Sequence, residues 1–111
     1  MTSLWEYETS VLRPDRDLVG YDVEAADGSI GKIDEASNDA SASYLVVDTG
    51  FWIFGKKRLI PAGVVERIDP NDEKVYVRMT KDQIKDAPDW DPDRDLGDQD
   101  YRSVHDKYYS S

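Results

Sequence analysis

One stretch organises this 111-residue sequence, and it reads Tyr44-Leu45-Val46-Val47-Asp48-Thr49-Gly50-Phe51-Trp52-Ile53-Phe54-Gly55-Lys56-Lys57-Arg58-Leu59-Ile60-Pro61. It begins as an apolar run rich in β-branched residues, passes through an aromatic connection bounded by glycines, and ends in a second short run stopped by proline. Alternation along a strand puts Leu45 and Val47 on one face and Tyr44, Val46 and Asp48 on the other. Both faces are mostly apolar, so we interpret residues 44–49 and 58–60 as two central strands of a small β-barrel.

Shorter strand patterns lie on both sides of this stretch. Residues 18–25 and 30–36 are separated by Asp27-Gly28, a strong hairpin signal because the tight turn needs a positive φ that glycine supplies. In the returning strand, Gly31 indicates a bulge or a close approach of another backbone. Residues 64–68 and 74–79 predict two further strands around a turn that contains Pro70. About six short strands are therefore expected.

A short helix is predicted after the last strand. Thr80-Lys81-Asp82-Gln83 is a capping box, in which the Thr80 hydroxyl accepts from the Gln83 amide and the Gln83 side chain accepts from the Thr80 amide. Ile84 is the apolar residue that anchors this helix, which should end before Pro88. The expected class is thus mostly β, a small barrel of about six strands with a short, capped helix toward the C-terminus.

The chain is short enough that we expect one domain with modest tails. We assign residues 1–17 to an N-terminal arm, 18–90 to the barrel domain and 91–111 to an acidic tail that we expect to be flexible. Trp5 is the residue expected to anchor the arm, because burial of an indole ring is strongly favourable.

Charge and composition exclude several classes of function. The formal net charge is -10, which argues against binding DNA by phosphate neutralisation, makes RNA an improbable partner and argues against docking on anionic lipid. There is no cysteine, so disulfides, thiolate nucleophiles and Cys-ligated metals are excluded. No secretory signal and no apolar run long enough for a membrane span are present, and we expect a cytoplasmic protein.

Several segments, in order and spacing, resemble the PRC-barrel domain family: Gly20-Tyr21-Asp22-Val23, residues 27–33, Tyr44-Leu45-Val46-Val47-Asp48, residues 56–61 and residues 80–88. The similarity covers roughly residues 18–90. It implies the β-barrel found in the cytoplasmic part of the photosynthetic reaction centre H subunit, in a ribosomal RNA maturation factor and in stand-alone bacterial and archaeal proteins. It also implies a protein-interaction and adaptor module without shared catalytic residues. We therefore expect neither the membrane anchor of the first protein nor the additional domain of the second, and a protein most like the short stand-alone type.

The aromatic connection is the sharpest candidate site. Phe51, Trp52, Ile53 and Phe54 are consecutive large apolar residues in a connection, where such residues are either buried or part of a contact surface. One interpretation is that these residues form a protein–protein interface. The simplest such interface joins two copies of this chain, because it needs no other partner. The alternative is a loop that folds over the barrel mouth or under the N-terminal arm. With Trp5, these residues form the predicted interaction site.

Three other features receive structural interpretations. Lys56-Lys57-Arg58 could meet an acidic partner, the acidic tail or RNA, but a solvated strand end is the favoured interpretation. Residues 91, 93 and 95 are aspartates spaced as in a calcium loop, but Leu96 and Arg102 occupy positions where that loop needs Gly and Glu. We therefore interpret this stretch as an acidic linker rather than a calcium site. His105, the sole histidine, lies in the polar tail and is interpreted as incidental.

Accordingly, we predict no catalytic residue, cofactor or metal site, and a protein that is not an enzyme. The favoured hypothesis is an interaction module that binds itself or another protein through the 51–54 connection. One alternative is an accessory of RNA processing or ribosome assembly, by analogy with the maturation factor. The other is a small-ligand binder that uses the barrel mouth.

Overall fold

The structure is a computed structural model, and it describes residues 4–7, 17–39, 42–50, 57–88, 90 and 99–110. The strands are β1 (Asp22–Ala25), β2 (Gly28–Asp39), β3 (Ala42–Asp48), β4 (Lys57–Pro61), β5 (Val65–Asp69) and β6 (Lys74–Val77). A 3-10 helix, η1 (Ala62–Val64), joins β4 to β5. Two α-helices follow, α1 (Lys81–Lys85) and α2 (Gln99–Ser110).

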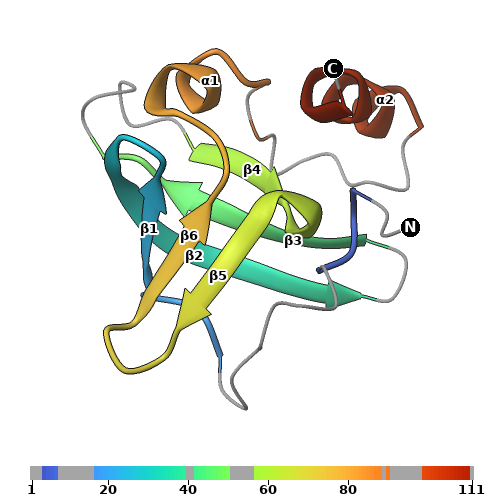
Figure 1. The fold of residues 1–111 in the computed structure, drawn as a ribbon. Coiled ribbons are helices and arrows are strands. Elements are labelled where there is room, and N and C mark those ends of the chain that lie inside the picture. The colour runs from blue at the N-terminus through green and yellow to red at the C-terminus, as the bar shows by residue number, and fades with distance from the viewer. Residues whose placement is uncertain are drawn as a thin grey trace.

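All six strands form one curved sheet in the order β4-β3-β2-β1-β6-β5 (Figure 1). Neighbours pair antiparallel except β1 and β6, which are parallel. The expected class is confirmed: a mostly β chain of six strands with a short capped helix, in which β2, with 12 residues, is longer than expected. The sheet is not closed by hydrogen bonds, because β4 and β5 form its two edges and are joined only through η1.

The hairpin predicted at Asp27-Gly28 joins β1 to β2. Ala25 pairs with Gly28, whose φ is +143°. The returning strand then carries a bulge opposite Val23 and Glu24, next to Gly31. Gly31 has φ +152°, and a Cβ built on it would lie 2.1 Å from the carbonyl oxygen of Asp48. The close backbone approach expected at this glycine is confirmed, and it packs β2 tightly against the end of β3.

The core has two parts, one on each face of β3 and β4. Leu45 and Val47 of β3 and Ile60 of β4 belong to the main cluster inside the curved sheet. Leu59 faces the other way and packs with Trp5 and Tyr101 in a second, smaller cluster. The expectation that both strands are central is right for β3 and wrong for β4, which is an edge strand. The arm and α2, rather than another strand, explain the apolar character of its outer face.

Helix α1 begins as the capping box predicts. The Gln83 N–H donates to the Thr80 hydroxyl at 3.2 Å, and the Thr80 N–H donates to the Gln83 side-chain oxygen at 2.9 Å. Ile84 is fully buried in the main core. The Lys81 N–H donates to the Asp27 carboxylate at 2.8 Å, which ties the start of α1 to the β1–β2 turn.

Both ends of the chain pack on the sheet. In the arm, the Leu4 carbonyl accepts from the Gly63 N–H at 2.7 Å, and the Trp5 carbonyl accepts from the Ser43 N–H at 2.8 Å. At the other end, α2 forms within the segment expected to be a flexible acidic tail; residues 91–98 lie outside the described residues. Tyr101, His105 and Tyr109 recur every four residues and so share one helix face. Mostly polar and charged residues fill the positions between them, so the composition of the segment does not reveal this amphipathic pattern.

We expect Gly31→Ala to destabilise the fold by about 2–4 kcal/mol, because the new methyl group overlaps the Asp48 backbone at a φ that alanine rarely adopts. Urea unfolding followed by circular dichroism measures this loss. Gly50→Ala is the matched control: Gly50 also has positive φ, +65°, but nothing lies within 4 Å of the added Cβ. It should cost only about 1 kcal/mol, and equal losses in the two variants would contradict the close approach.

Candidate functional site

The N-terminal arm and α2 meet in a contact that combines several kinds of interaction. The Trp5 side chain is 3% exposed and packs against Leu59 of β4 and Tyr101 of α2. Its Nε1–H donates to the Asp106 carboxylate at 2.5 Å, and the Arg102 guanidinium lies 5.3 Å from the ring centroid. An apolar contact, a charge-assisted hydrogen bond and a cation–π contact therefore converge on one indole ring.

His105 lies in the same helix face and is completely buried, with 0% of its surface exposed. Its Nδ1 lies 3.0 Å from the Tyr101 carbonyl oxygen, and its ring packs against Tyr101 at 4.7 Å and Tyr109 at 6.4 Å between centroids. Its Nε2 finds no hydrogen-bond partner among the described residues. Burial lowers the pKa of His105 because the charged ring would lose its hydration. The expectation that this residue belongs to a polar tail is wrong.

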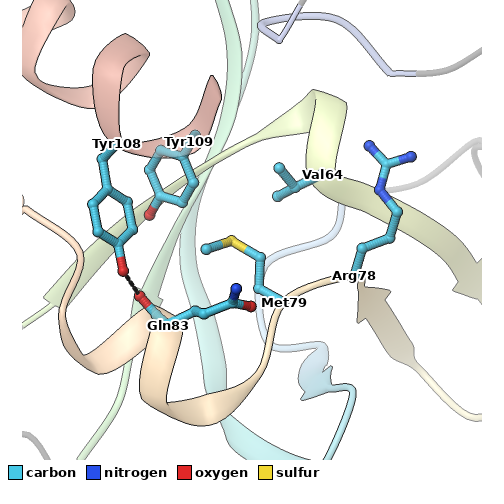
Figure 2. A pocket seen from close by; sticks show the side chains of 6 residues that line it. All are labelled: Val64, Arg78, Met79, Gln83, Tyr108 and Tyr109. Atoms are coloured by element: carbon cyan, nitrogen blue, oxygen red, sulfur yellow. Dashed lines mark hydrogen bonds between the residues drawn. The ribbon is translucent and has the colours of Figure 1, made fainter. Parts of the chain in front are cut away.

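A pocket of about 300 Å³ opens between η1, the end of β6, α1 and the last turn of α2. Figure 2 shows Tyr108 and Tyr109 on one side, Arg78 on the opposite side and Met79 between them; the lining residues are Val64, Arg78, Met79, Gln83, Tyr108 and Tyr109. The Tyr108 hydroxyl donates to the Gln83 carbonyl, and the Tyr109 hydroxyl donates to the Leu59 carbonyl at 2.7 Å. Burial raises the pKa of both tyrosines, so both stay protonated donors.

A model of the PRC-barrel domain matches residues 12–84, about two thirds of the sequence. The chain belongs to the PRC-barrel family. No curated protein matches the sequence significantly. The matched segment runs through all six strands and ends at Ile84, within α1. The contact between Trp5 and α2 therefore lies outside the part of this PRC-barrel protein that the family model matches.

Two of the three residues in the basic cluster have internal roles in this PRC-barrel domain. Arg58 is 4% exposed, and its guanidinium donates to the carbonyls of Ile84 at 3.1 Å and Lys85 at 2.9 Å. It therefore satisfies carbonyl groups at the C-terminal end of α1. Lys57 pairs with Asp34 at 2.6 Å and lies 5.7 Å from the Trp90 ring centroid. The expectation of a solvated strand end is wrong for Arg58, while Lys56 lies outside the described residues.

Of the predicted interaction residues, the structure describes one. Phe51, Trp52, Ile53 and Phe54 lie outside the described residues, as do the aspartates at 91, 93 and 95. Trp5 is described, and its contacts are within its own chain. None of the helices in the described ranges has the length and apolar character needed to cross a membrane. Sequence reasoning missed the pocket, because its walls come from four elements that share no local motif.

A double-mutant cycle tests the link between the arm and α2. We expect Trp5→Phe to cost about 1–2 kcal/mol, because phenylalanine keeps an apolar ring but leaves the Asp106 carboxylate without its indole donor. Asp106→Ala should cost a similar amount, since it removes the acceptor of the same hydrogen bond. Urea unfolding of both single variants and the double variant gives the coupling energy. Strictly additive losses would contradict the indole–carboxylate contact.

Burial of His105 predicts that the free energy of unfolding decreases as the pH is lowered. Its pKa is lowered in the folded state, so its protonation is favoured by unfolding, and stability should fall as the pH drops below the ordinary histidine pKa of about 6.5. Between about pH 7.5 and 5.5 the loss due to His105 is at most about 1.4 kcal/mol. Urea unfolding of wild type and His105→Phe at both pH values isolates it. Parallel pH dependence of the two proteins would refute this assignment.

Proposed function

We propose that this PRC-barrel protein is a non-enzymatic protein-interaction module whose contact surface is centred on the connection between β3 and β4. The proposal is carried by one observation: the segment Phe51-Trp52-Ile53-Phe54 lies in the sequence between β3 and β4, which are adjacent antiparallel strands. The chain leaves β3 through a turn in which the Gly50 N–H donates to the Asp48 carboxylate at 3.0 Å, and it enters β4 at Lys57. Connections between adjacent antiparallel strands run over the surface of a domain.

Large apolar residues in such a connection are typical of a contact site. Trp and Phe bury much area at little cost in conformational freedom, and a few such residues contribute most of the binding energy of an interface. The partner we propose is a second copy of the chain, since one self-complementary patch is enough to form a two-fold dimer. Each copy carries a net charge of -10, so attraction between two copies has to come from the apolar patch rather than from opposite charges.

Contacts elsewhere in the domain support this function over the two alternatives. The Arg58 guanidinium is bonded to carbonyl groups of α1, and Lys57 is paired with Asp34. Less positive charge is therefore available to bind the phosphates of an RNA. In the pocket, the two tyrosine hydroxyls are engaged with backbone carbonyls. They serve to hold α2 in place, whereas a ligand site has polar groups directed at the ligand.

We expect Trp52→Ala to weaken self-association by about 30-fold, equivalent to about 2 kcal/mol, because the largest apolar side chain of the contact is lost. Light scattering over a concentration series measures the change. Val104→Ala is the control, since it shortens a side chain that is 52% exposed on α2, and it should leave the dissociation constant unchanged. A wild-type protein that is monomeric at high concentration would refute the proposal.

A further inference from the structure

The outer edge of β4 already has an occupant within its own chain. Because β4 ends the strand order, one row of its backbone groups points away from β3. The Lys57 carbonyl accepts from the Trp90 N–H at 3.3 Å, and the Leu59 carbonyl accepts from the Tyr109 hydroxyl at 2.7 Å. Two residues further along, Pro61 has no N–H. The edge is therefore covered by the C-terminal part of the chain.

The outer face of β4 is covered by the same helix. Leu59 is 1% exposed and is enclosed by Trp5 and Tyr101. Figure 1 shows α2 next to both the N-terminal arm and α1, on the side of the sheet where β4 lies.

If α2 leaves, the Leu59 carbonyl loses the Tyr109 hydroxyl and the Leu59 side chain loses Tyr101, so the edge opens at Leu59. Trp90, which holds the Lys57 carbonyl, precedes α2 and is not part of this release. Open apolar strand edges pair readily with other strands.

Docking of α2 is coupled to protons through His105. The ring is completely buried, Nδ1 is next to the Tyr101 carbonyl oxygen, and Nε2 has no partner among the described residues. A proton on the ring would create a charge that the docked helix leaves without an acceptor at Nε2. Once α2 is undocked, water hydrates the same charge. Protonation therefore favours the undocked helix.

The charged groups around this contact do not reverse that preference. The Asp106 charge favours the protonated ring, but the effect of burial is larger. The Asp106 carboxylate is also engaged by the Trp5 indole. The other titratable or charged groups that lie near this contact on α2, β4 and β3 are Arg102, Tyr101, Tyr109, Arg58 and Tyr44.

We propose that the outer edge of β4 at Leu59 is a docking surface for the same edge of a second copy, covered by α2 in the neutral fold and uncovered when His105 is protonated. This surface is separate from the 51–54 contact proposed above, and it acts under different conditions.

A second copy fits the uncovered edge because a strand edge is complementary to itself in antiparallel pairing. With the two-fold axis at Leu59, the Leu59 side chains of the two copies meet and re-form an apolar contact. Lys57 of one copy then stands opposite Pro61 of the other, so like charges are not brought together. Each Lys57 also keeps Asp34 of its own chain as a partner.

The test is the mass of the full chain by light scattering at about pH 7.5 and about pH 5.5, values on either side of the histidine pKa. We expect the mass of Trp52→Ala, in which the 51–54 contact is weakened, to double at the lower pH. In wild type the mass should at least double, because a dimer formed through residues 51–54 has two β4 edges. His105→Phe, which retains an aromatic ring and takes up no proton, should keep its neutral-pH mass. His105→Lys, which carries a charge at both pH values, should have the doubled mass already at pH 7.5. Repeating the series in Trp52→Ala separates this dimer from one formed through residues 51–54.

Two outcomes of the mass measurement would overturn the proposal. One is an unchanged wild-type mass at the lower pH. The other is equal doubling in wild type and His105→Phe, which would assign association to the general loss of negative charge.

A second measurement needs no substitution at His105. As the sole histidine, its ring gives one unambiguous nuclear magnetic resonance signal, and the indole signal of Trp5 should shift at the same midpoint as α2 leaves. A histidine that titrates without any change at Trp5 would contradict release of α2.

Because the chain has no cysteine, a single introduced thiol locates the contact. In the His105→Lys protein, Leu59→Cys should form a disulfide-linked dimer on mild oxidation, because the two-fold axis brings the two copies of this position together. Val19→Cys is the control, since Val19 is 48% exposed and lies outside β4. Equal cross-linking at both positions would exclude the β4 edge as the contact.

Discussion

Strand β4 is buried on both faces and along its edge, and the packing of both chain ends follows from this burial. The strand ends the sheet, yet its residues are almost entirely buried. The inner face is covered by the curved sheet, the outer face by Trp5 and α2, and the edge by Trp90 and Tyr109. Both ends of the chain are therefore required to complete a domain whose sheet is not closed by hydrogen bonds.

The two ends stabilise one another through a single indole ring. Trp5 is held to the sheet by backbone contacts of the arm and to α2 by Asp106 and Arg102. Burial of such a ring is worth several kcal/mol, whereas the buried His105 lacks a partner for one ring nitrogen among the described residues. The helix face that docks on the sheet thus contains Tyr101, which packs firmly against Trp5, and His105, whose buried ring has one nitrogen unsatisfied within the described part of the chain. The second of these makes the docking of α2 responsive to pH.

Membership of the PRC-barrel family accounts for the sheet, and the features that favour an interaction role lie at its margins. The 51–54 connection leads into β4, and the edge of β4 lies under a helix beyond the family match. The polar groups nearest to these features are engaged in the fold: Arg58 with the end of α1, and Tyr108 and Tyr109 with backbone carbonyls. These polar groups therefore hold the two helices to the sheet.

Features encoded by short-range patterns could be predicted from the residues alone: the strands from alternation, the start of α1 from the Thr80–Gln83 capping box and the close approach from Gly31 within a strand. The edge position of β4, the capping of α1 by Arg58 and the packing of α2 on the sheet became visible only in three dimensions. These depend on contacts between distant positions, as with Trp5 and Asp106, which are 101 residues apart. Such contacts follow from the path of the whole chain, and no local pattern of residues records them.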